Sequence, residues 1–255
     1  MKEGKIRLAK RIAESGAASR REAERFIEEG RVKVDGEVVK TPVFFVSENN
    51  VVSIDEKIIS KKSEEIKIWK FYKPNGVITS RKDSKGRSTV FDYFKKFDQD
   101  RLLYIGRLDC NSEGLLLFTN NGDLARKMEL PKNALQRTYR IRIFGKLSEN
   151  AKEKLKRGVI IDGIKYGSVK IIEENEMTTA KNRWLKVTLF EGKNREIRKL
   201  MQYFGCSVNR LIRISYGPFY LGNTMQPGQI EKIGRREVEK FLSQYFRVYR
   251  QIILE

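Results

Sequence analysis

A polar stretch at residues 59–65, ISKKSEE, carries no apolar periodicity and divides the chain into a short and a long part. We therefore predict a small domain over residues 1–60, a linker over 61–65 and a larger domain over 66–245, followed by a basic, aromatic tail over 246–255. The chain has 255 residues, of which 40% are hydrophobic, so it can bury a sizeable core.

The small domain carries the signals of two helices and a hairpin. Residues 5–15 place apolar side chains four apart and end before Gly16, which predicts a short helix. Ser19 followed by Glu22 is the pattern of a capping box at the start of a second helix. Residues 31–40 alternate around an Asp-Gly turn, which is typical of a β-hairpin.

The larger domain mixes strand and helix patterns without a regular strand–helix–strand repeat. Alternating or apolar runs predict strands in IKIWKFYK, LLYIG, LLLFT, QRTYRIRIFG and RWLKVTLFEG. Helices are expected in VFDYFKKF, from Asp123 onward, and between Asn194 as N-cap and Gly205 as the stop. This order favours an α+β fold with a mixed, largely antiparallel sheet.

The chain is strongly basic, with 53 Lys and Arg against 33 Asp and Glu and a formal net charge of +20. Such a charge favours a polyanion or an anionic membrane surface as partner. The sequence has neither an apolar run long enough to span a bilayer nor a basic amphipathic tail with a clean apolar face, so nucleic acid is the better expectation. The first residues lack the apolar region of a signal peptide, which favours a cytoplasmic location.

Histidine is absent, which excludes Ser-His-Asp and Cys-His machinery and any imidazole ligand or base. Cys110 and Cys206 have no paired spacing for zinc, so we interpret both as reduced thiols and expect no metal site. The GxxxxGK[ST] and GxGxxG loops that bind ATP and dinucleotides are also absent. Any catalysis must rest on Asp, Glu, Tyr, Lys, Arg, or a Ser or Cys with an unusual partner.

Basic side chains gather in the first half of the small domain, although residues 1–60 as a whole hold 12 basic and 11 acidic residues. On two helices and a hairpin they could form a stripe that faces phosphates. A solvated helix face with alternating charges explains the pattern equally well. The residues concerned are Lys5, Arg7, Lys10, Arg11, Arg20, Arg21, Arg25, Arg31 and Lys33.

One acid, Asp109, lies between two apolar runs in YIGRLDCNSEGLLLFTNNG, residues 104–122. A turn-forming aspartate whose side chain accepts backbone N–H bonds is one interpretation. The other is a carboxylate held in a cationic cleft for a reaction, because an unused negative charge there would weaken the binding of a polyanion. The spacing alone leaves both interpretations open.

The stretch RLAKRIAESGAASRREAERFIEEGRVKVDGEVV resembles an S4 domain, a small RNA-binding module found on several ribosome-associated proteins. The resemblance covers most of residues 5–58. It implies that the helices lie against folded RNA and that the basic stripe contacts the RNA backbone. Such contacts position a protein without reading the base sequence.

Four further segments are, in chain order, KPNGVITSRKDSKGRSTVFD, GRLDCNSEGLLLFTNNGDLARKM, QRTYRIRIFG and EGKNREIRKLMQYFG. They resemble successive motifs of the ribosomal RNA pseudouridine synthases, in the branch that joins an S4 domain to the catalytic domain. The resemblance implies an isomerase that breaks the N-glycosidic bond of a uridine in RNA, turns the uracil and joins carbon 5 to the ribose, without cofactor or metal. The last segment is most similar to the large-subunit enzymes, the B type especially.

The resemblance also assigns roles at the site. Asp109 in GRLD corresponds to the catalytic carboxylate, and Arg198 corresponds to the arginine that pairs with it. Tyr139 corresponds to the tyrosine beneath the target base, where its ring would stack on a flipped uracil and its hydroxyl would assist proton transfer at carbon 5. Arg107 is expected to fill the space left by the everted nucleotide or to bind its phosphate. Without the resemblance, Tyr139 fits core packing better and Arg198 fits an ordinary surface arginine.

Five basic residues of the larger domain are assigned only to binding of the RNA backbone: Lys73, Arg81, Lys82, Arg140 and Arg142. The expected partner is ribosomal RNA or an assembling ribosomal subunit, bound by a monomer, because the sequence shows no self-complementary apolar patch. Three alternatives stay open. They are a small-subunit ribosomal RNA pseudouridine synthase, a non-enzymatic S4 RNA-binding ribosome assembly factor, and a general nucleic-acid binder that works by charge alone.

Overall fold

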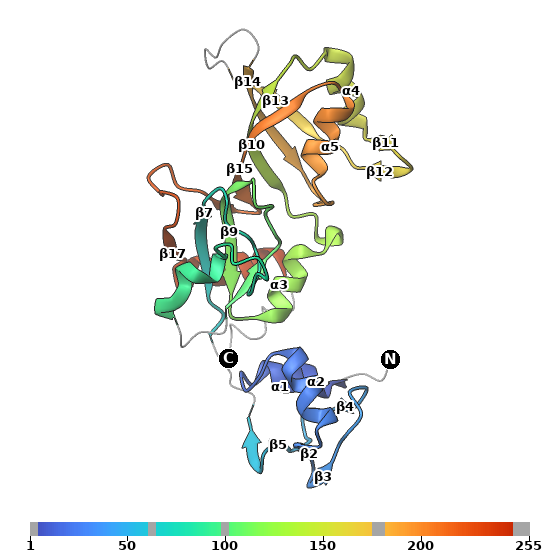
Figure 1. The fold of residues 1–255 in the computed structure, drawn as a ribbon, viewed down its shortest axis with the longest axis vertical. Coiled ribbons are helices and arrows are strands. Elements are labelled where there is room, and N and C mark those ends of the chain that lie inside the picture. Colours follow the sequence, from blue (N-terminus) through green and yellow to red (C-terminus); the bar gives the residue numbers. More distant parts are fainter. Residues whose placement is uncertain (1–4, 61–64, 98–101, 175–181, 247–255) are drawn as a thin grey trace. The chain divides into compact units, whose positions relative to one another are not determined.

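The computed structural model describes residues 5–60, 65–97, 102–174 and 182–246 (Figure 1). The chain divides into two units, Met1–Glu65 and Ile66–Glu255, called here the N-terminal unit and the C-terminal unit. Most of the predicted linker, residues 61–64, lies outside the described residues. Among the described helices, none combines the length and the apolar character that a membrane span requires.

Two helices and a four-stranded antiparallel sheet form most of the N-terminal unit. The helices are α1 (Leu8–Glu14) and α2 (Arg20–Glu28). The sheet has the order β3-β2-β5-β6, and its strands are β2 (Val32–Val34), β3 (Glu37–Val38), β5 (Val52–Ile54) and β6 (Lys57–Ile59). A separate pair joins β1 (Ile6–Arg7) to β4 (Phe45–Val46). The predicted order of helix, helix and hairpin is confirmed, and β5 extends the hairpin by pairing with the second edge of β2.

Local sequence fixes the start of α2. The backbone N–H of Glu22 donates to Ser19 Oγ at 3.3 Å, and the backbone N–H of Ser19 donates to Glu22 Oε2 at 2.9 Å, which confirms the predicted capping box. Leu8, Ile12 and Ile27 are completely buried in the core of this unit. The apolar spacing therefore places one face of each helix in that core.

A nine-stranded sheet organises the C-terminal unit. Its main path is β13-β14-β10-β15-β9-β7-β17, while β16 pairs with β15 and β8 pairs with β9. Among the described strand pairs of this sheet, only β15 and β9 are parallel, so the predicted mixed, largely antiparallel sheet is confirmed. The strands are β7 (Ile68–Lys73), β8 (Leu103–Ile105), β9 (Glu113–Thr119), β10 (Arg137–Phe144), β13 (Lys170–Glu173), β14 (Asn182–Leu189), β15 (Ser207–Tyr216), β16 (Phe219–Tyr220) and β17 (Ile230–Lys232).

Helices and a small hairpin complete the C-terminal unit. The α-helices are α3 (Gly122–Glu129), α4 (Glu149–Arg157), α5 (Glu196–Tyr203) and α6 (Arg235–Tyr245). Two 3₁₀ segments are η1 (Val90–Phe97), where a helix was predicted, and η2 (Pro131–Asn133). The hairpin joins β11 (Val159–Ile161) to β12 (Ile164–Tyr166).

Each face of the large sheet is covered by its own core. Along β9, Leu116 and Phe118 belong to the core that also contains residues of η1, α4 and α5. Leu115 and Leu117 belong to the core that contains residues of α3 and α6. Burial on both faces explains why residues 115–118 of β9 form a continuous apolar run.

Two details of the C-terminal unit differ from the prediction. Asn194 is not the N-cap of α5, because the chain enters that helix through Arg195 in a left-handed conformation with φ 52°. The predicted stop at Gly205 is confirmed, since Gly205 has φ 75° directly after the helix. Phe246, the first residue of the predicted tail, is buried in the core with α3 and α6, and residues 247–255 lie outside the described residues.

Candidate active site

Loop 106–112, which joins β8 to β9, carries Asp109. The backbone N–H of Ser112 donates to the carbonyl of Asp109 at 3.0 Å, so the chain turns back at this point. Among the described residues, no backbone N–H donates to the Asp109 carboxylate, and the side chain is 37% exposed. The interpretation of Asp109 as a turn-forming side chain is therefore wrong, because the turn uses its carbonyl and leaves the carboxylate available.

Buried donors hold this loop in place. Lys73 Nζ, at the end of β7, donates to the carbonyls of Ser112 at 2.7 Å, Pro74 at 3.0 Å and Cys110 at 3.4 Å. The backbone N–H of Gly76 donates to the same Cys110 carbonyl at 2.9 Å. The segment after β7 therefore fixes the second half of the loop.

The first half of the loop is fixed by Thr79. Its hydroxyl donates to the Leu108 carbonyl at 2.8 Å and accepts from the Leu108 N–H at 3.3 Å. The residue directly before Asp109 thus has both backbone groups bonded to one side chain. These two bonds fix the backbone directly before Asp109.

Lys73 was predicted to bind the RNA backbone, and that prediction is wrong. The side chain is completely buried, and the three carbonyls satisfy its ammonium group. Burial lowers the pKa of Lys73 to about 8, although the nearby Cys110 and Asp109 oppose the shift. A buried cation without such partners would cost several kcal/mol. Lys73 is therefore part of the scaffold of the loop.

Gly114, just after the loop, allows β9 to approach β15 closely. A Cβ at this position would lie 2.4 Å from the Arg213 carbonyl oxygen and 2.7 Å from the Arg213 nitrogen, and the residue has φ 102°. Only glycine accepts both the conformation and the contact. The parallel pairing of β9 with β15 thus depends on this residue.

The arginine that pairs with Asp109 is Arg195. Its Nη1 lies 3.7 Å from Asp109 Oδ2. Arg198, which the resemblance paired with Asp109, instead donates from Nη1 to the Val208 carbonyl at 2.8 Å and from Nη2 to the Asn111 carbonyl at 2.7 Å. The described residues show no direct pair between Arg198 and Asp109: two nitrogens of Arg198 donate to backbone carbonyls, and its Nε is buried without a partner.

Arg198 still contributes to the electrostatics of the site. Burial lowers the pKa of Arg198, Arg195 adds to that effect, and Asp109 opposes it. Arg195 and Arg198 both come from the start of α5, and Arg198 also ties loop 106–112 to that helix through Asn111. One helix end thus supplies an ion pair to Asp109 and a support for its loop.

Among the described residues, neither Tyr139 nor Arg107 forms a hydrogen bond or ion pair with Asp109. Tyr139 lies on β10, is 8% exposed and packs in the core with Ile141 and Ile143. It is paired in register with Val187 on β14 and Arg213 on β15. Arg107 is exposed, two residues before Asp109. The structure therefore supports core packing for Tyr139 and leaves the Arg107 side chain facing solvent.

The basic segment 80–88 is ordered by an acid. Asp83 Oδ2 accepts from the backbone N–H of Arg87 at 2.9 Å and from its Nε at 3.0 Å, and Asp83 Oδ1 accepts from Arg87 Nη2 at 2.8 Å. These bonds hold the pKa of Asp83 well below its usual range. Lys82 is exposed in this segment, while Arg81 donates to the Leu102 carbonyl at 2.5 Å and lies over the Phe91 ring at 4.5 Å.

Arg140 and Arg142 differ in their surroundings. Arg140 Nε donates to Glu174 Oε2 at 2.6 Å, and its guanidinium group lies 4.3 Å from the centre of the Trp184 ring. Arg142 is exposed, 6.0 Å from the same ring. The assignment of Arg140 to RNA binding is weakened because its charge is already balanced, whereas Arg142 stays a prediction.

Two buried arginines were missed by the sequence analysis. Arg213 is 1% exposed and donates from Nε to the Leu115 carbonyl at 2.7 Å. Arg137 is 7% exposed and donates to the Tyr216 hydroxyl at 2.8 Å, and that hydroxyl donates to the Met128 carbonyl at 2.9 Å. Nothing in the local sequence separates these arginines from surface ones, because their partners are carbonyls and a phenol far along the chain.

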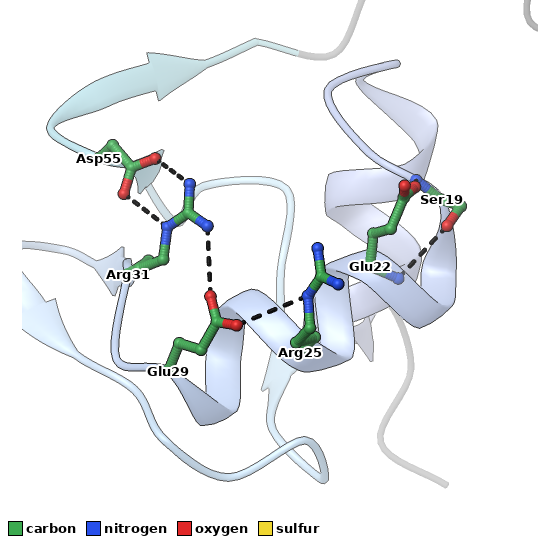
Figure 2. A network of polar contacts seen from close by, with 6 residues as sticks. All are labelled: Ser19, Glu22, Arg25, Glu29, Arg31 and Asp55. Carbon is green, nitrogen blue, oxygen red and sulfur yellow. Dashed lines mark hydrogen bonds and ion pairs between the residues drawn. The ribbon is translucent and has the colours of Figure 1, made fainter.

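In the N-terminal unit, part of the predicted basic stripe is tied to acids (Figure 2). Arg31 donates to Asp55 through two bonds of 2.9 and 2.5 Å and to Glu29 at 3.2 Å. Arg25 pairs with Glu29 at 3.5 Å, which makes one chain of contacts across α2 and the sheet. Arg31 also lies over the Phe26 ring at 4.2 Å.

The remaining residues of the stripe fall into two groups. Lys10 pairs with Glu14 at 3.3 Å and Lys33 pairs with Glu56 at 2.6 Å. Among the described residues, no acidic side chain pairs with the other five, which are Lys5, Arg7, Arg11, Arg20 and Arg21. These five are therefore the members of the stripe whose charge is available to a partner.

Comparison with known proteins shows the family to which this chain belongs. The chain matches the family model described as RNA pseudouridylate synthase over residues 67–203 and the S4 domain model over residues 6–52. An uncharacterized RNA pseudouridine synthase from Rickettsia felis is 46% identical over 236 residues, covering 92% of this chain and 99% of the relative. The ribosomal large subunit pseudouridine synthase B of Yersinia pestis is 37% identical over 246 residues, covering 94% of this chain and 75% of the relative.

A solved pseudouridylate synthase is similar in structure as well. It is 25% identical, superposes with a TM-score of 0.64, and the match covers 92% of this chain and 99% of that chain. The match therefore includes the N-terminal unit as well as the C-terminal one. This chain belongs to the RNA pseudouridine synthases, as an enzyme whose catalytic domain follows an N-terminal S4 RNA-binding domain.

Proposed function

We propose that this enzyme converts one uridine of large-subunit ribosomal RNA to pseudouridine, with Asp109 as its catalytic carboxylate. The similarity to the Yersinia pestis enzyme, whose name states the large ribosomal subunit, supports the choice of RNA. The exposed basic side chains of the N-terminal unit, Arg20 and Arg21 among them, are suited to the phosphates of a folded RNA. We propose that the enzyme acts as a monomer.

Uridine and pseudouridine are isomers, so their atoms and electrons balance without a cofactor. The bond between N1 and the ribose C1′ breaks, the uracil turns, and a bond forms between C5 and C1′. The proton on C5 leaves and N1 gains a proton. The target base must first leave its stack, at a cost of a few kcal/mol.

The geometry of loop 106–112 carries the assignment of Asp109. An aspartate with a purely structural role uses its carboxylate oxygens on nearby backbone N–H groups. Here the loop is held by Lys73, Thr79 and Arg198, and among the described residues the one ion pair of the Asp109 carboxylate is with Arg195. A group whose position is fixed by others, and whose own oxygens stay available, is suited to touch a substrate.

The other assigned residues have supporting roles in this proposal. Arg107 is exposed and two residues from Asp109, so it is placed to occupy the gap left by the everted nucleotide or to bind its phosphate. Tyr139 is proposed to lie beneath the uracil and to assist proton transfer at C5. Its side chain is 8% exposed, so only a small part of it is open to a base.

Chemical mapping of pseudouridine tests the proposal directly. Unmodified large- and small-subunit ribosomal RNA are each incubated with the wild-type protein and with Asp109→Asn. We expect one new site, on large-subunit RNA, made only by the wild type, because asparagine keeps the shape and loses the charge. We expect a loss of at least about 10³-fold in rate, in the range for removing a group that acts on the reacting atoms.

Two results would contradict separate parts of the proposal. Appreciable turnover by Asp109→Asn would overturn the role of Asp109, provided that both proteins bind RNA equally. A site on small-subunit RNA alone would overturn the choice of subunit and leave the catalytic role intact.

A further inference from the structure

Two acidic side chains meet in the turn that leads into α5. Glu196 is 4% exposed, and its Oε2 accepts from the backbone N–H of Lys193 at 2.8 Å. Its Oε1 is buried and accepts from no donor among the described residues. Glu191 Oε1 accepts from the Gly167 N–H at 2.7 Å, and Glu191 Oε2 is bonded to the ammonium group of Lys193.

The contact between these two carboxyl groups requires a proton. Glu191 and Glu196 are both bonded to Lys193, Glu191 to its ammonium group and Glu196 to its backbone N–H, so their carboxyl groups lie close together. A carboxylate can only accept, so two ionised carboxylates cannot bond and would repel each other. Glu191 already has donors on both oxygens, one of them an ammonium group. The proton therefore belongs on Glu196 Oε1, which has no other partner.

The other charged and titratable groups around Glu196 fit this assignment. On the preceding turn are Lys193, which is bonded to Glu191, and Arg195, which faces Asp109. On α5 itself, Arg198 is engaged by two carbonyls. From β10, the Arg137 guanidinium group lies close to Gly192, and from β12 the Tyr166 ring lies 5.7 Å from Lys193 Nζ. None of these cations bonds to Glu196 among the described residues.

The turn held by Glu196 carries the partner of Asp109. Arg195 directly precedes Glu196 and has a left-handed backbone with φ 52°, a conformation that an arginine adopts only when its surroundings impose it. The bond from Lys193 N–H to the Glu196 carboxyl closes the turn around this residue. The position of the Arg195 side chain, 3.7 Å from Asp109, thus depends on Glu196.

We propose that Glu196 is a positioning residue that works as a neutral carboxylic acid: by donating its proton to Glu191, it fixes the turn that presents Arg195 to Asp109. This inference rests on the proposed catalytic role of Asp109. Burial raises the pKa of Glu196 to about 7, and the charge of Glu191 adds to the shift. As the pH rises through that value, two negative groups come to face each other, the turn loosens, and activity falls.

A pH profile of the reaction tests this inference. The substrate is large-subunit ribosomal RNA transcribed with uridine that carries tritium at C5, and release of tritium at single turnover measures the rate. We expect Glu196→Gln, which keeps a neutral donor, to match the wild type at about pH 6 and to hold its rate to higher pH. The alkaline limb of the profile should therefore move to higher pH.

Glu191→Gln should weaken the alkaline fall in rate as well, because ionisation of Glu196 then no longer brings two negative groups together. The matched control is Glu149→Gln, which changes an exposed glutamate in the first turn of α4 and should leave the profile unchanged. A readout independent of activity is infrared spectroscopy of the folded protein below pH 7. It should show a protonated carboxyl band that Glu196→Gln removes.

Several outcomes would overturn the inference. If the pH profiles of the wild type and Glu196→Gln superimpose, ionisation of Glu196 does not cause the fall in rate. If the infrared spectrum has no carboxyl band that Glu196→Gln removes, Glu196 is not protonated. A loss of rate in Glu196→Gln at every pH, with unchanged thermal unfolding, would show that the charge itself is needed. If Asp109→Asn is inactive in the same assay, these failures concern Glu196 alone and not the proposed function.

Discussion

The two units place the same kinds of side chain in opposite environments. In the N-terminal unit, the guanidinium group of Arg31 and the carboxylate of Asp55 pair at the surface, with side chains 40% and 51% exposed. In the C-terminal unit, Lys73 and Arg213 are almost completely buried, and their partners are backbone carbonyls. These charged side chains therefore pair at the surface of one unit and support the interior of the other.

This difference shows why a count of basic residues does not locate an RNA-binding face. An exposed cation interacts with its partners through solvent, so its replacement changes the free energy of unfolding little. A buried cation is held by specific acceptors, and its removal leaves those acceptors without donors. Substitutions in the two units should therefore affect different measurements.

The largest effect is expected at Gly114. In Gly114→Ala, the added Cβ meets the backbone of Arg213, so β9 and β15 must separate. We expect the free energy of unfolding to fall by more than about 3 kcal/mol and activity to be lost. Both tryptophans, Trp69 and Trp184, belong to the C-terminal unit, so urea unfolding followed by tryptophan fluorescence reports on this unit.

The matched control is Gly16→Ala in the N-terminal unit. Gly16 has φ 82° but open space around its Cβ position, so the cost should be only about 1–2 kcal/mol. This unit has no tryptophan, so its unfolding is followed as the part of the circular dichroism change that does not coincide with the fluorescence transition of the other unit. Equal costs at both positions would contradict the close approach of β9 to β15.

A smaller effect is expected from Lys73→Met. Methionine fills the space but leaves the carbonyls of Pro74, Cys110 and Ser112 without their shared donor, at a cost of about 1–3 kcal/mol. Release of the loop that carries Asp109 should lower the rate of product formation even under conditions where the protein stays folded. Urea unfolding and single-turnover assays measure the two effects separately.

Lys82→Met provides the comparison for Lys73→Met. Lys82 is exposed on segment 80–88, so its replacement should leave unfolding unchanged and reduce only RNA affinity. Full activity in Lys73→Met would show that loop 106–112 does not need its buried cation.

The smallest effect is expected from Arg20→Gln combined with Arg21→Gln. Both residues are exposed on the first turn of α2 and have no acidic partner among the described residues. Affinity for large-subunit RNA should fall, and the dependence of affinity on salt should weaken by up to about 0.9 log unit per lost phosphate contact. The unfolding midpoint and the rate at saturating RNA should not change.

Arg25→Gln tests the specificity of that result. Arg25 lies on the same helix but pairs with Glu29, as part of the network in Figure 2. Its replacement should change RNA affinity less than the double substitution does. An equal or larger loss would show that ion pairing does not decide which arginines bind RNA.

Features with local causes could be predicted from the sequence. The capping box of Ser19 and Glu22 needs only four residues, and the alternation of residues 137–144 marks a half-buried strand wherever it occurs. The two-domain division and the sheet type followed from such local patterns. Asp109 was found because its sequence surroundings resemble a family motif.

Features that depend on distant contacts could not be predicted in the same way. Arg195 pairs with Asp109 because the start of α5 lies beside loop 106–112. The two segments are far apart in the chain, so local sequence does not predict this contact. Lys73 is an intermediate case: it lies two residues from Phe71 and four from Trp69, so strand periodicity places it on their buried face. That signal was present and could have excluded Lys73 from the surface.

The parallel contact at Gly114 also affects the order in which the protein forms. Arg213 and Leu115, which bond beside this contact, are 98 positions apart, whereas Arg31 and Asp55 in the N-terminal unit are only 24 apart. Contacts between distant residues form slowly and need the later residue to have been made. During synthesis, the S4 domain can therefore fold well before the parallel contact beside loop 106–112 forms.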